Sequence, residues 1–118
     1  GVDKYGHLVV LDRTFKAKVD DLLSNITDEE FIRHMAARRE AMRAMTTLLC
    51  AKNQKRVYKA ILVVDLDGLS FGHVAGSNGK RFMARLKASN GIFAWYYPES
   101  TFKVIVFNAP LIFQGLWK

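Results

Sequence analysis

Three short apolar runs constrain this chain more than any other feature of its sequence. They lie at residues 8–11, 58–66 and 102–107, and the second has the centre Ile61-Leu62-Val63-Val64. Runs that are apolar on both faces are typical of strands covered on two sides, as in parallel sheets. The two intervals between the runs carry helical patterns. The sequence therefore predicts an α/β fold, with a mostly parallel central sheet, right-handed crossovers and helices packed on it.

A long helix is predicted between the first two strands. Thr27-Asp28-Glu29-Glu30 matches a capping box, in which Thr27 caps the helix and Glu30 binds back to it. We expect this helix to end near residue 51. Arg38 interrupts its apolar stripe, where a charge is costly unless it is paired, reaches water, or contacts a partner domain or a lipid phosphate. The stripe itself consists of Phe31, Met35, Met42, Met45 and Leu49.

A second helix is predicted over residues 78–93, and Pro98 ends the helical region because proline disfavours helix at the preceding residue. The segment at residues 76–80, GSNGK, is not a phosphate-binding loop. The Walker motif needs four residues between its glycines and Ser or Thr after its lysine. We interpret the segment as a helix-initiating loop. Residues 111–117 have the pattern of the first turns of a further helix.

The composition bounds the remaining possibilities. The chain has 118 residues, enough for one domain, and one cysteine, which excludes an intramolecular disulfide and cysteine-rich zinc sites. No apolar run approaches the roughly 20 residues of a transmembrane helix, and the first residues lack the apolar core of a signal peptide. We therefore expect a cytoplasmic domain. Without a nucleophile elbow or an HxxxH pair, we expect no enzyme activity, no cofactor and no metal.

A net charge of +7 makes polyanions the expected partners. Basic clusters lie at residues 38–43, 52–59 and 80–87. No RNA-recognition or helix-turn-helix signature supports a nucleic-acid partner. This leaves a solvated basic face, or a transient peripheral contact with an anionic membrane surface. The candidate membrane contacts are Lys80, Arg81 and Arg85.

Two carboxylates end the central strand, Asp65 and Asp67, just before Gly68. Ligands of open α/β sheets gather at the carboxyl ends of the strands, so a metal-binding or acid–base role is conceivable here. However, alternate strand residues point to opposite faces, and aspartates before glycine favour turns. Turn formation therefore explains the pair better.

Three segments of the chain, in order and on the predicted strands, resemble the CRAL-TRIO lipid-binding domain family. Residues 1–10, GVDKYGHLVV, are similar to its opening G-x-D-x-x-G-R-P-V strand, with His7 and Leu8 where Arg-Pro is usual. Residues 65–68, DLDG, resemble the D-L-x-G end of its central strand. Residues 97–110, YPESTFKVIVFNAP, resemble its Y-P-E and I-N-A-P segment. The resemblance spans essentially the whole chain.

The resemblance implies an α/β sandwich whose sheet floors an apolar pocket closed by a gate helix. Members of the family are soluble carriers of single lipids, such as phosphatidylinositol, phosphatidylcholine, tocopherol or retinal, and are not generally enzymes. Glu99 matches the glutamate that lies near the inositol headgroup in phosphatidylinositol-binding members. Ala60 and Leu62 lack the hydroxyls of phosphatidylcholine-binding members, which favours phosphatidylinositol. With Glu99, the implied ligand contacts are Ala60, Leu62, Val64 and Phe107.

The resemblance leads us to expect that residues 1–118 correspond to part of the family domain, without its N-terminal helical subdomain and its C-terminal gate region. We therefore expect a partial CRAL-TRIO domain whose uncovered sheet promotes self-association. The expected function is to hold one phospholipid or other hydrophobic ligand and to transfer it. One alternative is a regulatory protein- or membrane-interaction module on the same fold. Another is an α/β nucleotide-binding enzyme, which the missing phosphate loop disfavours.

Overall fold

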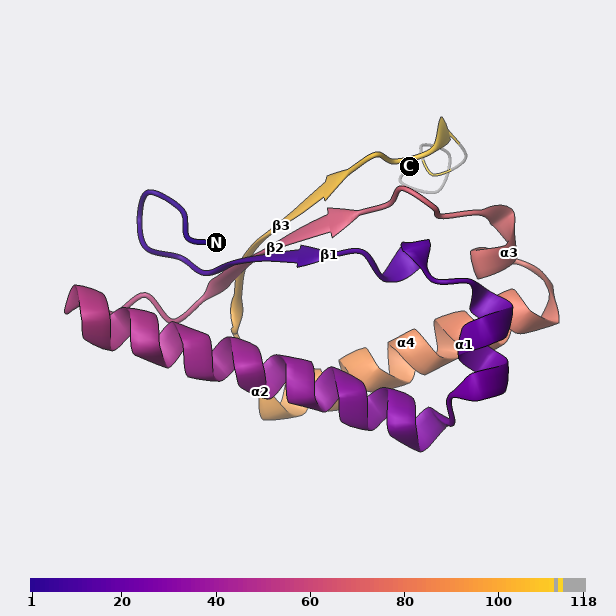
Figure 1. The fold of residues 1–118 in the computed structure, drawn as a ribbon, viewed down its shortest axis with the longest axis horizontal. Helices are drawn as coiled ribbons and strands as arrows, with labels where there is room; N and C mark the ends of the chain where they lie inside the picture. Colours follow the sequence, from indigo (N-terminus) through magenta and orange to yellow (C-terminus); the bar gives the residue numbers. More distant parts are fainter. Residues whose placement is uncertain (112, 114–118) are drawn as a thin grey trace.

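A parallel three-stranded sheet organises the computed structural model, which describes residues 1–111 and 113 (Figure 1). Its strands are β1 (Val9–Asp12), β2 (Ala60–Asp65) and β3 (Thr101–Phe107), in the order β1-β2-β3. Both strand pairs are parallel, so each connection must cross over the sheet. All three predicted strands are found, and the predicted α/β class is confirmed.

The crossovers are built from two long helices and three short ones. The predicted long helices are α2 (Asp28–Asn53) and α4 (Gly76–Tyr96). The short elements, which are too brief to give a periodic pattern, are the 3-10 turn η1 (Thr14–Lys16), α1 (Val19–Asn25) and α3 (Phe71–Val74). Residues 76–80 form the first turns of α4, which begins at Gly76. The segment therefore starts a helix as predicted, but it is helical and not a loop. Of the helix predicted over 111–117, residues 112 and 114–118 lie outside the described residues.

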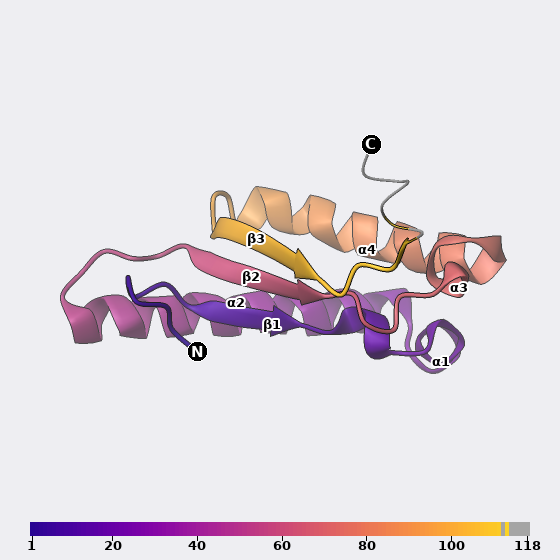
Figure 2. The same cartoon turned by 90° about the horizontal axis from the view of Figure 1, so that it is seen from above.

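Both long helices lie on one side of the sheet. Figure 1 shows α2 and α4 below the strands, and in Figure 2 the strands lie in front with α2 behind them. Right-handed crossovers explain this arrangement, because the strand order advances in a single direction from β1 to β3. Within residues 1–111, no helix covers the opposite face of the sheet (Figure 2).

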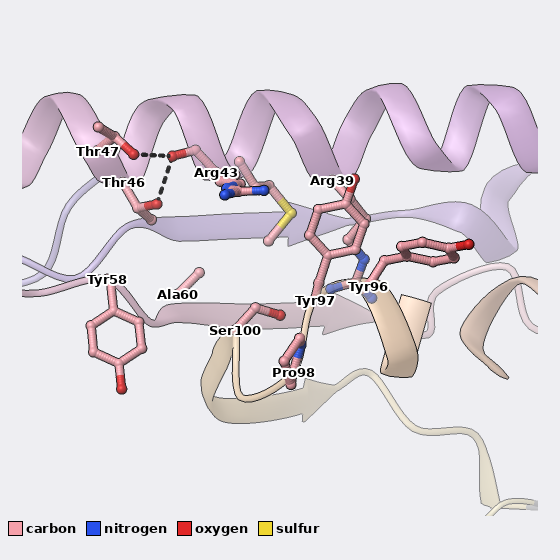
Figure 3. Close-up of a pocket in the computed structure, with 11 residues that line it drawn as sticks. Arg39, Arg43, Thr46, Thr47, Tyr58, Ala60, Tyr96, Tyr97, Pro98 and Ser100 are labelled. Atoms are coloured by element: carbon pink, nitrogen blue, oxygen red, sulfur yellow. Dashed lines mark hydrogen bonds between the residues drawn. The ribbon is translucent and has the colours of Figure 1, made fainter. Parts of the chain in front are cut away.

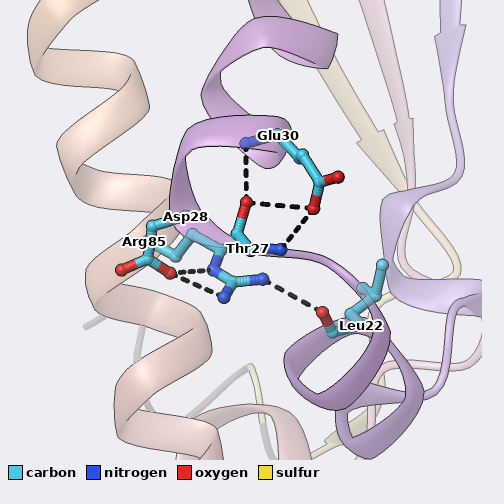
Figure 4. A network of polar contacts seen from close by, with 5 residues as sticks. All are labelled: Leu22, Thr27, Asp28, Glu30 and Arg85. Carbon is cyan, nitrogen blue, oxygen red and sulfur yellow. Dashed lines mark hydrogen bonds and ion pairs between the residues drawn. The ribbon is translucent and has the colours of Figure 1, made fainter.

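The predicted capping box starts α2. The Thr27 backbone nitrogen donates to Glu30 Oε2 at 2.8 Å, and the Glu30 backbone nitrogen donates to Thr27 Oγ1 at 3.2 Å. Two of the amide donors at the start of the helix are thereby satisfied. The bonds also fix the direction in which α2 leaves the α1–α2 junction (Figure 4).

Arg85 of α4 crosses to the same junction (Figure 4). Its Nε donates to Asp28 Oδ1 at 2.7 Å, its Nη2 lies 2.6 Å from the same oxygen, and its Nη1 donates to the Leu22 carbonyl at 3.0 Å. The guanidinium also lies over the Phe31 ring, 5.6 Å from its centroid. Only 7% of Arg85 is exposed. One side chain therefore joins α1, α2 and α4.

The main hydrophobic core lies between the two long helices. Phe31 and Met35 of α2 pack with Phe93 of α4, and Leu86 and Tyr97 lie against them. Of the predicted apolar stripe, Phe31 and Met35 are buried and Met42 and Leu49 are partly buried, but Met45 is 48% exposed. The reason is geometric: the C-terminal half of α2 projects past α4, as Figure 1 shows.

Gly79, the second glycine of the GSNGK segment, has a packing role at the start of α4. A Cβ at this position would lie 2.7 Å from the Gly72 carbonyl oxygen and 3.1 Å from the backbone of Val74. Glycine therefore allows α3 and α4 to approach each other closely. Close packing therefore explains why glycine occupies this position, and no phosphate-binding role is needed to explain it.

Arg85→Gln is expected to lower the free energy of unfolding by about 2 kcal/mol, because the Leu22 carbonyl loses a charged donor and Asp28 loses its partner. Arg81→Gln is the matched control, since Arg81 is exposed one turn earlier on α4. It should change the free energy by less than about 0.5 kcal/mol. Urea unfolding followed by circular dichroism measures both, and equal losses would contradict the buried role of Arg85.

Candidate functional site

The four predicted ligand contacts on the strands, Ala60, Leu62, Val64 and Phe107, do not all lie on the same face of the sheet. Leu62 and Val64 line a cavity of about 200 Å³ together with residues of α2 and α4, and Ala60 lines a neighbouring cavity against α2. Phe107 is in register with Asp65, which points away from Val64, so Phe107 belongs to the opposite face. The four strand positions do not form one pocket floor: three face the helices and one faces away from them.

The sheet face that no described helix covers is mainly apolar. By register it carries Leu11 of β1, Val63 of β2, and Ile105 and Phe107 of β3, together with the charged residues Lys103 and Asp65. Leu11 is 47% exposed, Ile105 44% and Phe107 38%. We call Leu11, Val63, Ile105 and Phe107 the open face. Exposed apolar side chains grouped on one face mark a place where a ligand, a membrane or another protein segment binds.

Arg38 is part of an internal ion pair on the helix side of the sheet. Its Nη1 lies 3.1 Å from Asp12 Oδ2, at the end of β1, and both side chains are largely shielded from solvent. Burial raises the pKa of Asp12, but hydrogen bonds from Thr14 and the charge of Arg38 outweigh burial, so the pKa lies below its usual value. The charge that interrupts the α2 stripe is thus explained by a partner within the domain.

Glu99 lies in the turn between α4 and β3. Its φ of 55° is in the left-handed region, which non-glycine residues rarely adopt. The side chain is exposed, and its Oε2 lies 3.7 Å from Lys59 Nζ. The backbone beside it is fixed, because Ala60 donates its amide to the Ser100 carbonyl at 2.9 Å. A carboxylate is therefore held at the end of the sheet where β2 and β3 begin.

Asp65 occupies the other end of β2 and is buried. Its Oδ1 accepts the Asp67 amide at 3.0 Å and Asn108 Nδ2 at 2.9 Å, and Oδ2 lies 3.6 Å from Arg13 Nε. The Asn108 hydrogen bond, with the Asp67 amide, lowers the pKa of Asp65. Gly68 completes the turn with a φ of +93°. The turn-forming interpretation of this aspartate is confirmed.

The three cationic residues predicted to contact a membrane differ in their exposure to solvent. Lys80 and Arg81 are exposed at the start of α4. Arg85 is buried against α1 and α2 and bound to Asp28, so the prediction that it contacts a membrane surface is wrong. The physical reason is that an arginine on the inner face of α4 is stabilised by a carboxylate and a carbonyl that the sequence separates widely.

A cavity of about 310 Å³ that the sequence did not reveal lies between α2, the start of β2 and residues 96–100 (Figure 3). Arg39 and Arg43 line it from α2, and in Figure 3 Arg39 extends toward Tyr96 and Tyr97. In the sequence, these two arginines were recognised only as members of the basic cluster at residues 38–43. Their spacing of four residues could have indicated that both arginines lie on one face of α2, since residues four apart share a helix face.

Two structural absences apply to the described residues alone. Across residues 1–111 and 113, no group of three or more His, Cys, Asp or Glu side chains is placed to hold a metal ion. In the same part of the chain, every helix is too short or too polar to cross a membrane.

Asp12→Asn is expected to destabilise the domain at pH 7 and to have a smaller effect at low pH. The folded pKa of Asp12 lies below the unfolded value of about 3.9, so its carboxylate contributes stability above that value. This contribution is lost as the pH falls through the folded pKa. Urea unfolding between pH 7 and pH 2 measures the difference between the two proteins. Asp21→Asn, at an exposed position on α1, should show a small difference throughout.

Comparison with known proteins identifies the family. No curated protein matches the sequence. A family model described as the CRAL/TRIO domain matches residues 1–118. The parallel sheet with helices on one side agrees with that match. The match indicates binding or transfer of a lipophilic ligand, and because it covers every residue of the sequence, this chain belongs to the CRAL/TRIO domain family.

Proposed function

We propose that this chain is a lipid-binding and lipid-transfer module that holds one phospholipid, with phosphatidylinositol as the preferred ligand. The observation that carries the proposal is the open face, an apolar surface on the side of the sheet that no described helix covers. The CRAL/TRIO match supports a lipophilic ligand for this surface. Binding requires no covalent chemistry, so the function is that of a carrier and not of an enzyme.

The dimensions of β3 suit an acyl chain. Glu99 precedes the strand and Phe107 ends it, and the strand itself, Thr101–Phe107, is about 20 Å long. The hydrocarbon of one membrane leaflet is roughly 15 Å thick, half of a bilayer core. A lipid whose headgroup is near Glu99 therefore has room for its tails along the open face. Burial of each methylene there contributes about 0.8 kcal/mol.

Glu99 is proposed to contact the inositol headgroup. Inositol is a polyol, and a carboxylate accepts hydrogen bonds from neighbouring hydroxyls. The turn presents this carboxylate to solvent, with Lys59 beside it. Lys59 can in turn bind the phosphate that joins inositol to the lipid.

Transient contact with a cytoplasmic, anionic membrane surface is proposed for Lys80 and Arg81. Both side chains project from the first turns of α4 into solvent. The net charge of +7 favours approach to such a surface, where each basic residue contributes about 1 kcal/mol.

Glu99→Gln is expected to reduce phosphatidylinositol binding about tenfold, because charge-assisted hydrogen bonds are lost. The fold should be unaffected, since an exposed ion pair contributes little to stability. Partitioning of fluorescent phosphatidylinositol between vesicles and protein measures the change. Glu29→Gln, an exposed glutamate on α2, is the control and should bind normally. Equal binding by the two variants would remove Glu99 from the site.

Ile105→Glu is expected to reduce binding of a hydrophobic dye and self-association of the chain, because it places a charge on the open face. Val104→Glu is the matched control, since Val104 is 54% exposed on the same strand but belongs to the opposite face. Dye fluorescence and sedimentation velocity report the two effects. If both variants behave alike, the open face is not the apolar binding surface.

A further inference from the structure

Two arginines of α2 line the 310 Å³ cavity without an acidic partner. Other arginines near this helix are paired: Arg33 with Glu29, Arg38 with Asp12 and Arg85 with Asp28. Within the described part of the chain, neither Arg39 nor Arg43 forms an ion pair.

The carboxylate next to these arginines in sequence, Glu40, is bound by a residue of the cavity wall. Glu40 accepts a hydrogen bond from the Tyr97 hydroxyl, which closes one end of the α2–α4 contact. Arg39 instead lies over the Phe93 ring, 5.7 Å from its centroid. Burial, with the neighbouring charge of Arg38, lowers the pKa of Arg39, and the charge of Asp12 opposes this shift only in part. The cavity thus has a positive charge that an entering anion would stabilise.

The cavity has the size and lining of a small anion site. Its volume of about 310 Å³ is at the lower end of the range for ligand pockets. Beyond the arginines, Ser100 adds a hydroxyl group, and Tyr96 and Tyr97 form an aromatic wall (Figure 3). The Thr46 hydroxyl also lines the cavity but already donates to the Arg43 carbonyl at 2.9 Å. Planar guanidinium groups bind phosphate oxygens through paired hydrogen bonds, and two of them one helical turn apart can share one phosphate.

We propose that this cavity binds a phosphate monoester, held by Arg39 and Arg43 of α2. The site is separate from the headgroup contact at Glu99, which does not line the cavity. A phosphate monoester can be a soluble metabolite or the headgroup of a lipid such as phosphatidate. The shared chemistry is a doubly charged terminal phosphate, and the source is a matter for experiment.

Two assays with the full chain separate the sources. Titration calorimetry with inorganic phosphate and with glycerol 3-phosphate measures soluble ligands. Flotation with phosphatidylcholine vesicles containing phosphatidate measures the lipid form. We expect saturable binding in at least one assay. Binding only to vesicles assigns the site to lipid headgroups, and binding of glycerol 3-phosphate assigns it to soluble monoesters.

Variants test whether the arginines are responsible. Arg43→Gln should weaken binding about tenfold, and the Arg39→Gln/Arg43→Gln double variant should abolish it. Arg39→Lys keeps the charge but loses the guanidinium fork, so an intermediate loss indicates geometry as well as charge. Because Arg39 packs on Phe93, its variants need a thermal-unfolding check, whereas Arg43 is exposed and its single variant should fold normally.

The charge-matched control is the Arg33→Gln/Lys87→Gln double variant, which removes two exposed positive charges outside the cavity. Its affinity for the probes should stay within about twofold of the unmodified chain. Equal weakening by the cavity and control variants would show nonspecific attraction and overturn the proposal. Absence of binding to all three probes would also overturn it. Neither result bears on Glu99→Gln, so the proposed lipid function can fail or survive independently.

Discussion

Parallel pairing of β2 on both of its edges is the constraint on which the rest of this structure depends. Its first amide donates to Ser100 beside β3, and the next donates to Leu8 beside β1. With both edges bonded, β2 cannot slip by one residue without turning all its side chains over. The register therefore decides that Leu62 and Val64 meet the helices and that Val63 meets the open face. It also fixes the side on which any ligand of the open face must lie.

Much of the fold could be predicted from the sequence because its signals are local. The apolar runs locate the strands, and Thr27 with Glu30 locates the start of α2. The division of Ala60 and Phe107 between two faces was harder, since it needs the register of β3 against β2, where an irregularity occurs near Ala60. The exposure of Met45 was missed for a related reason: a helical stripe has a periodicity but does not show where its partner helix ends.

The arginines show the same limit for the candidate site. The sequence gives a net charge of +7 but not which charges reach solvent. Arg85 and Arg38 are paired internally with carboxylates 57 and 26 residues away, so they add little to the external field. Arg39, next to Arg38, is left without such a partner and contributes to a cavity instead. Tertiary contacts alone separate these roles, because all three residues belong to similar basic, helical surroundings.

The helix layer is fastened at both ends of the α2–α4 contact. Arg85 binds Asp28 at one end, and the Tyr97 hydroxyl binds Glu40 at the other, with Phe31, Met35 and Phe93 packed between them. Such a double attachment opposes sliding or splaying of the two helices. The helix layer behind the sheet is thus held rigid, which lowers the entropy cost of ordering this part of the domain when a ligand binds. Conformational change on binding would then occur in the segment that covers the ligand. The rate of ligand exchange would depend on that segment, and the affinity on the sheet surface.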